Sequence, residues 1–222
     1  FAMLVVEKRR IRPNIKTVLR SIVCLVREPD NLDHIYDLED GLRDTKASLL
    51  AVEWLNTQPE VAQLIQERYI APPPDIEALL QYPKDSLGYA YAVYIQKAGF
   101  DPSFYRTIQV EDNVSYFLLR VRQTHDIWHV VTGFKTDTNG EIGLKAFELA
   151  QTRRNLAVFL VGAAMLATLA TSPQALPNLL KQIVLGYQMG EKAKPLFAQK
   201  WEENWEKPLL QWRSELGIEV SL

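Results

Sequence analysis

The sequence predicts an all-α fold, a single multi-helix domain over residues 1–222 whose helices pack around an apolar centre. Apolar residues recur every three or four positions in most segments, which is the spacing of an amphipathic helix. No segment alternates polar and apolar residues between hairpin turns, as half-buried strands do. The chain has 222 residues, of which 47% are hydrophobic and 23% charged, enough to bury a core in a globular protein.

The expected helices follow one another along the chain. Pro59 suits the first turn of a helix, Asp75 is a suitable N-cap, and Gly99 is a typical stop signal. The segment 27–43 reads as an acidic, polar connection. Residues 114–122 favour a strand by composition, but no partner strand is evident, so we assign them to a helix that continues into the next segment. The expected helices cover residues 15–26, 45–57, 59–69, 76–82, 86–97, 114–134, 141–151, 156–171, 176–196 and 201–218.

Composition argues against several classes of protein. The formal net charge of −2 lacks the basic balance of a nucleic-acid-binding protein, so no nucleic-acid partner is expected. Cys24 is the only cysteine, which excludes a disulfide within the chain and a thiolate zinc cluster and suggests a reducing compartment. The opening FAMLVVEKRRIRP places its apolar run before the basic residues, the wrong order for a secretory signal. We therefore expect a protein that is not secreted but cytoplasmic, or peripheral on the cytoplasmic face of a membrane.

The most apolar segment, residues 156–171, is shorter than the roughly 20 residues that a membrane-spanning helix needs. Three interpretations stay open for it: a buried core helix, a wall of an apolar pocket, or a helix that rests against a membrane. Residues 8–12 are basic and suit either contact with anionic lipid or a solvated tail.

Residues 124–141 carry the candidate metal site. His125 and His129 are one helical turn apart, so both can face one ion. Asp126 is a third ligand or a partner that orients an imidazole. The Asn-Gly pair at 139–140 is a strong turn signal, and a return helix from Glu141 can bring that carboxylate back to the histidines. Two imidazoles with one or two carboxylates suit zinc, iron or cobalt better than calcium, with magnesium left open if the histidines are spectators.

An ordinary helix followed by an acidic helix start is the alternative, because the helix dipole by itself favours Glu141 there. A protease of the HExxH type is disfavoured, since an aspartate replaces its glutamate base. An HD-type phosphohydrolase would share the His125-Asp126 pair. That class needs a further histidine upstream and an aspartate downstream, for which His34 and Asp137 are poor fits.

The string His-Asp-x-x-His, followed by eleven residues and Glu, resembles the signature of the coenzyme Q biosynthesis protein four family. DSLGYAYAVYIQKAGFDP resembles that family's Gly-aromatic helix ahead of the motif. EIGLKAFELAQT resembles its continuation, and WEENWEKPLLQWRSELGI its C-terminal segment. The likeness covers about residues 55–222.

This resemblance implies an all-helical protein of ubiquinone or prenylquinone biosynthesis. It implies a divalent metal, usually taken as zinc, held by His125, Asp126, His129 and Glu141. It also implies removal of the ring carboxyl of a prenylated hydroxybenzoate, and scaffolding of other quinone-biosynthesis proteins. One hypothesis is thus a metal-dependent decarboxylase with Asp126 and His129 as catalytic residues, which needs a redox metal or an external oxidant if the reaction is oxidative. The other is a non-catalytic isoprenoid-lipid carrier or scaffold.

An isoprenoid or prenylquinone-type lipid would need an apolar pocket, since each buried methylene contributes about 0.8 kcal/mol. We expect a lipid-sized pocket beside the metal site together with peripheral membrane contact, and the chain is compatible with a homodimer. Simple core packing is the alternative for each residue of the pocket. The candidate lining residues are Tyr91, Tyr94, Phe159, Gly162, Ala163, Met165 and Leu166.

Overall fold

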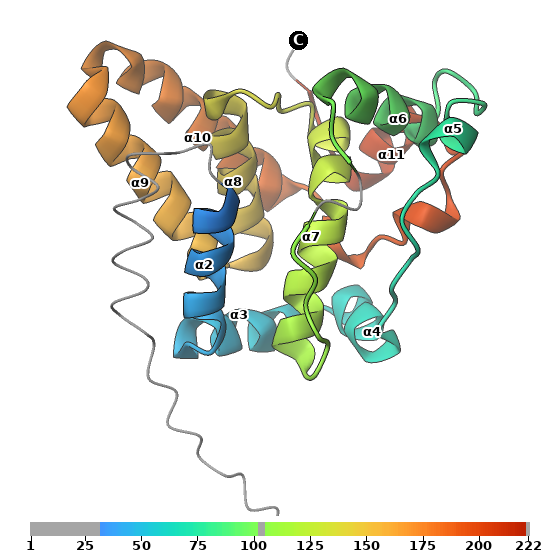
Figure 1. Cartoon of the computed structure of the whole chain (residues 1–222), viewed down its shortest axis with the longest axis horizontal. Coiled ribbons are helices and arrows are strands. Elements are labelled where there is room, and N and C mark those ends of the chain that lie inside the picture. Colours follow the sequence, from blue (N-terminus) through green and yellow to red (C-terminus); the bar gives the residue numbers. More distant parts are fainter. Residues whose placement is uncertain (1–31, 102–104, 221–222) are drawn as a thin grey trace, which may run out of the picture.

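The computed structural model describes residues 32–101 and 105–220, and every regular element in these ranges is a helix (Figure 1). The predicted all-α fold with one helical domain is therefore confirmed. The helix expected at 15–26 and the basic residues 8–12 lie outside the described residues. The α-helices are α2 (Leu32–Arg43), α3 (Lys46–Leu55), α4 (Pro59–Glu67), α5 (Ile76–Leu79), α6 (Leu87–Ala98), α7 (Asn113–Thr132), α8 (Thr138–Thr152), α9 (Asn155–Thr171), α10 (Leu176–Lys192) and α11 (Leu209–Leu216), and the 3-10 helices are η1 (Pro173–Ala175), η2 (Leu196–Ala198) and η3 (Trp201–Glu203).

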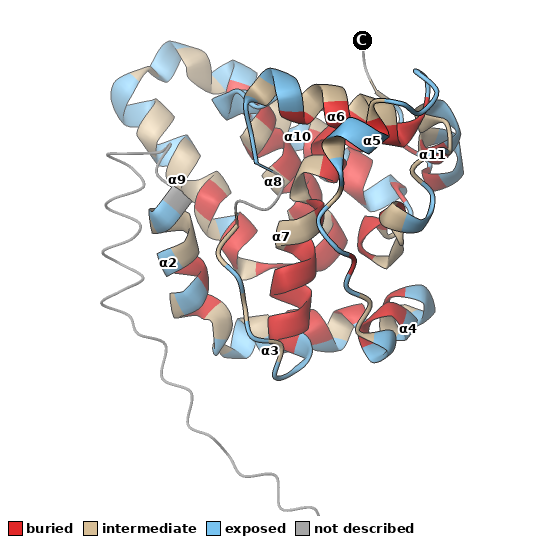
Figure 2. Ribbon diagram, turned by 45° about the vertical axis from the view of Figure 1, so that its right-hand side comes forward, coloured by how far each residue is buried: buried red, intermediate tan, exposed pale blue. Residues whose placement is uncertain are grey.

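Helix α7 runs through the core and contacts α3, α4, α6, α8 and α11. Most of its residues are buried, and Figure 2 shows it as a largely buried column with other helices around it. It begins at a capping box, in which Asp112 accepts a hydrogen bond from the Ser115 amide at 2.7 Å and Ser115 Oγ accepts one from the Asp112 amide at 2.9 Å. Burial on nearly all sides explains the strand-like composition of residues 114–122, because β-branched and aromatic side chains also fill a helical core.

Helices α8 and α10 pack closely because glycines face the contact. A Cβ atom on Gly186 would lie 1.9 Å from the carbonyl oxygen of Gly143, and one on Gly190 would lie 2.6 Å from that of Phe147. No larger residue fits at Gly186 without separating the two backbones. This contact fixes the position of α8, the helix that carries Glu141.

The part of the predicted polar connection that the structure describes, residues 32–43, forms a helix instead, α2. Its apolar residues recur at helical spacing, and Leu38 and Leu42 pack against Leu156 and Leu160 of α9. The many acidic residues hid this periodicity, although most of them lie on the exposed face of the helix.

Several predicted helices are shorter than expected; the helix expected at 76–82, for example, is α5 and ends at Leu79. The segment 201–218 divides into η3 and α11, because Pro208 at the break cannot donate the backbone hydrogen bond of a continuous helix. Helix α10 ends at Lys192, where Ala193 takes an extended conformation two residues before Pro195.

Buried arginines connect elements that are distant in sequence. Arg122 of α7 and Arg154, the N-cap of α9, both pair with Glu39 of α2, and Arg154 also contacts Glu148 at 2.6 Å. Arg120 donates to Glu202 at 2.6 Å and 2.9 Å. Removing one partner would leave an uncompensated buried charge, so these pairs have a structural role.

Candidate metal centre

Three of the four predicted ligands converge at the junction of α7 and α8. Nε2 of His129 lies 3.0 Å from Oε1 of Glu141, and Nε2 of His125 lies 3.5 Å from Oε2 of the same carboxylate. One ligand atom from each residue falls within 4.8 Å of the other two. Metal bonds of about 2 Å place two ligands of one ion at most roughly 4 Å apart, so both His–Glu separations suit a shared cation.

The turn that returns Glu141 to the histidines lies earlier than the sequence indicates. The Asn-Gly pair at 139–140 is in the first turn of α8, which begins at Thr138. Gly133, with φ of 80°, ends α7, and Asp137 caps α8 by accepting a hydrogen bond from the Gly140 amide at 2.9 Å. Asp137 thus has a capping role, and the aspartate that a phosphohydrolase would need is not in the ligand group.

The backbone fixes the imidazole of His129. Its Nδ1 atom lies 2.9 Å from the carbonyl oxygen of Phe134. A carbonyl oxygen only accepts, so Nδ1 carries a proton, and in the neutral form of the ring Nε2 would present its lone pair to Glu141. The Phe134 ring packs against Gly143 of α8, so closely that a Cβ atom on Gly143 would lie 2.6 Å from the ring. This contact holds the turn against α8. Sequence reasoning missed this partner because any residue type supplies a backbone carbonyl.

The resulting arrangement fits a cation. The Nε2 atom of His129 is buried and has no hydrogen-bond partner within the part of the chain that the structure describes. A lone pair at 3.0 Å from a carboxylate oxygen is repelled unless a proton or a cation lies between the two atoms. Burial raises the pKa of Glu141, but protonated His125 and His129, through hydrogen bonds and positive charge, outweigh that effect and hold the pKa well below its usual range; a cation in place of these protons would act in the same direction. The carboxylate is therefore ionised and available as a ligand.

The accessibility of the three groups differs along the site. The His129 side chain is fully buried, whereas those of His125 and Glu141 are 27% and 37% exposed. A set of two histidines and one glutamate is typical of catalytic zinc sites and of non-haem iron sites, in both of which further positions stay open for other ligands. The residues present thus fit a divalent metal, with His129 as the buried member of the group.

Asp126, the fourth predicted ligand, is outside the group of three. It is partly exposed on α7, and no described residue donates a hydrogen bond to it. Its negative charge still acts on neighbouring tyrosines. The pKa values of Tyr91 and Tyr94 are raised mainly by burial, and the charge of Asp126 raises them further.

The predicted apolar pocket is not shown by the structure. Its two expected walls, α6 and α9, lie on opposite sides of α7 and α8 in both views (Figures 1 and 2). Tyr91 is buried and stacks on Trp205 at 5.3 Å between ring centroids, while Tyr94 stacks on His129 at 5.9 Å. Contact of these tyrosines with a lipid stays a prediction.

The candidate pocket residues of α9 lie at the surface or only partly below it. Phe159 packs against the buried cluster between α2 and α9, and Gly162 and Ala163 are half-buried. Met165 is 36% exposed and Leu166 65%. No helix among residues 32–101 and 105–220 has both the length and the apolar character needed to span a membrane.

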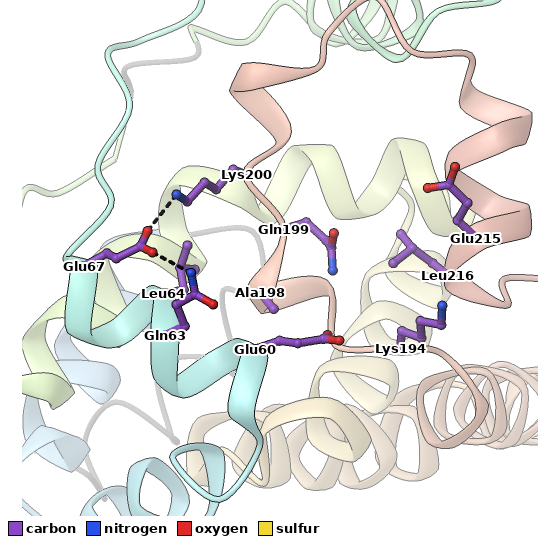
Figure 3. Close-up of a pocket in the computed structure, with 10 residues that line it drawn as sticks. All are labelled: Glu60, Gln63, Leu64, Glu67, Lys194, Ala198, Gln199, Lys200, Glu215 and Leu216. Carbon is purple, nitrogen blue, oxygen red and sulfur yellow. Dashed lines mark hydrogen bonds and ion pairs between the residues drawn. The ribbon is translucent and has the colours of Figure 1, made fainter.

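Two hollows lie apart from the convergent ligands, and both have polar linings. The larger, of about 340 Å³, is lined by residues of α4, η2, α11 and their flanking loops. Figure 3 shows its charged rim, where Glu67 pairs with Lys200 at 2.6 Å and accepts from Gln63. The other, of about 280 Å³, lies behind the turn at Phe134 and Gly140. Neither is the apolar, lipid-sized pocket that was expected.

Comparison with known proteins places this site in a family context. The family described as "Coenzyme Q (ubiquinone) biosynthesis protein Coq4" matches residues 21–221. A COQ4 homologue of Aedes aegypti is 28% identical over 66% of this chain and 53% of its own length. The COQ4 protein of Eremothecium gossypii is 32% identical over 75% of this chain and 49% of its own length. This chain thus spans about half the length of these curated relatives, whose names also carry the word mitochondrial.

A solved structure is also similar to this chain. It is a crystal structure of a protein from Nostoc punctiforme that is provisionally assigned to ubiquinone biosynthesis. The TM-score is 0.84 at 33% identity, over 94% of this chain and all of the other. The helical arrangement described above is therefore shared with an experimentally determined relative.

Proposed function

This chain belongs to the Coq4 family of coenzyme Q (ubiquinone) biosynthesis proteins, and we propose that it is a metal-dependent protein acting on a prenylated quinone precursor. His125, His129 and Glu141 would hold a divalent metal, with zinc, iron, cobalt and magnesium as candidates. The ligand would be a prenylated hydroxybenzoate, whose anionic head binds at the metal and whose isoprenoid tail contacts apolar surface.

One observation carries the metal part of this proposal: the buried Nε2 atom of His129 faces the Glu141 carboxylate with no hydrogen-bond partner among the described residues. The backbone hydrogen bond at Nδ1 leaves that lone pair free. A purely structural pair would orient a donor toward an acceptor. Two acceptors that face each other, with a third ligand atom nearby on His125, are typical of a site that holds a cation.

When bound, a divalent metal would supply a Lewis acid that stabilises negative charge on a carboxylate or phenolate oxygen. The chain itself would supply ligand orientation through Phe134 and a half-buried carboxylate in Asp126. Loss of the ring carboxyl as carbon dioxide leaves a ring carbon that takes up a proton, and Asp126 is the candidate carrier. The oxidative version replaces the carboxyl with hydroxyl and consumes dioxygen and a two-electron donor, with the second oxygen atom leaving as water.

Metal analysis of the purified protein tests this proposal. We expect about one equivalent of a divalent metal in the wild type and almost none in His129→Ala, since removing a ligand of a three-residue site abolishes tight binding. His34→Ala is the matched control, because it removes the histidine that lies outside the ligand group. Equal metal content in all three proteins would refute the metal site.

Activity is tested separately on the metal-loaded protein. Purified wild type should release carbon dioxide from a prenylated 4-hydroxybenzoate, with dioxygen and a reductant added for the oxidative version, and His129→Ala should not. A metal-loaded wild type that binds this compound without turning it over would support the second candidate function, a non-catalytic lipid carrier or scaffold for other quinone-biosynthesis proteins.

The surface of α9 and α10 supports the lipid-binding part of both candidates. No charged residue occurs between Asn155 and Leu180. Leu166 and Leu169 of α9 are 65% and 56% exposed, and Val184 of α10 is 52% exposed. Exposed apolar residues gathered on neighbouring helices are typical of a surface that meets a membrane or a lipid. We propose peripheral membrane contact through this surface.

A further inference from the structure

Tyr94 of α6 places a hydroxyl group beside the metal centre without using it in the fold. The side chain is partly buried, but its oxygen is inaccessible to solvent and has no hydrogen-bond partner among the described residues. Buried polar atoms in folded proteins are almost always paired, and an unpaired one calls for an explanation. One such explanation is a ligand: the partner of the Tyr94 hydroxyl would then belong to a bound molecule and not to the protein.

The ring of Tyr94 packs directly against a residue of the candidate metal centre. One face of Tyr94 stacks on the His129 imidazole at 5.9 Å and 22°, and Phe100 contacts the ring edge-on at 6.3 Å. The negative charges of Asp126 and Glu141 both act on its hydroxyl. The hydroxyl thus belongs to a ring that lies against a candidate ligand, His129, and a phenylalanine would make the same ring contacts without the unpaired oxygen.

We propose that Tyr94 positions the ligand of this site by donating a hydrogen bond to an anionic oxygen, a carboxylate or phenolate, of a molecule held at the metal centre. This inference rests on the metal centre proposed above and adds the residue that selects the head group. A phenol is a donor at neutral pH, and Asp126 and Glu141 supply acceptors but no donor. A neutral donor opposite a metal would favour a ligand that presents negatively charged oxygen to both.

The alternative is a structural tyrosine whose partner is simply another part of the protein. The two explanations differ in the sign of a stability change. If the hydroxyl waits for a ligand, Tyr94→Phe removes an unpaired buried oxygen, and the metal-free protein becomes more stable. If the hydroxyl has a structural partner, the same substitution breaks a hydrogen bond and lowers stability.

Cobalt-loaded protein and 4-hydroxybenzoate as the probe allow a direct test, because the visible spectrum of cobalt(II) changes when a ligand reaches it. We expect Tyr94→Phe to bind as much cobalt as the wild type but to bind 4-hydroxybenzoate roughly tenfold more weakly. We also expect the melting temperature of the metal-free variant to rise by about 2–4 °C. The control is Tyr116→Phe, which removes a hydroxyl that already donates to the Tyr69 carbonyl at 2.9 Å and should leave probe affinity unchanged.

The outcomes separate this inference from the proposed function. Equal affinity of Tyr94→Phe and wild type for the probe, or a lower melting temperature of the metal-free variant, would overturn the role of Tyr94 alone. A wild-type protein that takes up no cobalt would overturn the proposed function, and this inference with it. Weaker probe binding in both tyrosine variants would assign the effect to a general loss of packing and also count against Tyr94.

Discussion

Gly140 and Lys135 approach each other so closely that a Cβ atom on Gly140 would lie 2.1 Å from the carbonyl oxygen of Lys135. This contact folds the turn between α7 and α8 back onto the first turn of α8. The neighbouring Phe134 carbonyl orients His129, and the next residue of α8 is Glu141. One close backbone contact thus sets the relative position of two predicted metal ligands.

Substituting this glycine should therefore affect stability and metal binding together. Gly140→Ala forces the turn away from α8, and we expect the free energy of unfolding to fall by about 2–4 kcal/mol, in the range of severe overpacking. Metal affinity should fall by at least roughly tenfold, as for the loss of an orienting contact. Urea unfolding and metal titration measure the two effects.

Gly162→Ala is the matched control. A Cβ atom at Gly162 meets nothing within 4 Å, and the residue lies inside α9. We expect this variant to be more stable by about 0.5–1 kcal/mol, because alanine loses less conformational freedom in a helix, with unchanged metal affinity. A neutral effect of Gly140→Ala on both measurements would contradict the role assigned to the turn.

The charge of Glu141 should matter more than its shape. Glu141→Gln keeps the size of the side chain but removes the ionised oxygens that face His125 and His129. We expect a loss of metal affinity of at least roughly tenfold, since a neutral amide is a poorer ligand for a divalent cation. Equilibrium dialysis with zinc measures it, with the exposed Glu191→Gln as a charge-matched control. Equal affinities of the two variants would count against Glu141 as a ligand.

The N-cap of α7 predicts a specific acid dependence of stability. Burial raises the pKa of Asp112, but its hydrogen bonds with Ser115 outweigh that effect and hold the pKa below its ordinary value of 3.8. A carboxyl with a lowered folded-state pKa contributes stability that is present above the unfolded value and is lost as pH falls through the folded value.

Asp112→Asn retains a capping side chain but cannot titrate. The stability of the wild type relative to this variant should be constant above about pH 5 and decrease as the pH falls below the ordinary aspartate value. Urea unfolding of both proteins across this range measures the difference. A difference that stays constant down to about pH 2.5 would show that Asp112 does not have the lowered pKa described here.

The apolar surface of α9 and α10 should bind membranes without being needed for folding. Leu166→Glu with Leu169→Glu changes two exposed side chains, so we expect a change in the free energy of unfolding of less than about 1 kcal/mol. Binding to vesicles of phosphatidylcholine and phosphatidylglycerol should weaken by at least roughly tenfold, because burial of two leucines is lost and charge is added. Vesicle sedimentation measures this.

Leu210→Glu is the control for that experiment. Leu210 is 74% exposed, but it lies on α11. One leucine-to-glutamate substitution there, against two on α9, should leave vesicle binding as it is in the wild type. Equal loss in both proteins would point to a general effect of negative charge and not to the surface of α9 and α10.

Sequence reasoning went furthest where the signal is local. The predicted N-cap at Asp75 begins α5 and the predicted stop signal at Gly99 ends α6 in the structure as in the sequence. It failed at α2, where acidic residues concealed an amphipathic period, and at Pro208, where one proline ends a run that otherwise looks helical. Both errors concern how a local signal was weighed and not a lack of information.

The sequence by itself determined the all-helical class, most helix boundaries to within a few residues, and His125, His129 and Glu141 as candidate ligands. Helical periodicity and residue spacing depend only on residues that are close together in the sequence. Only the tertiary structure decided that Asp126 lies outside the group of three candidate ligands, that the Phe134 carbonyl orients His129, and that Tyr94 stacks on His129. The tertiary structure also decided that the residues of α9 expected to form an apolar pocket wall lie at or near the surface. These features depend on which faces of distant helices meet, and the contact of α8 with α10 and the burial of α7 set that geometry.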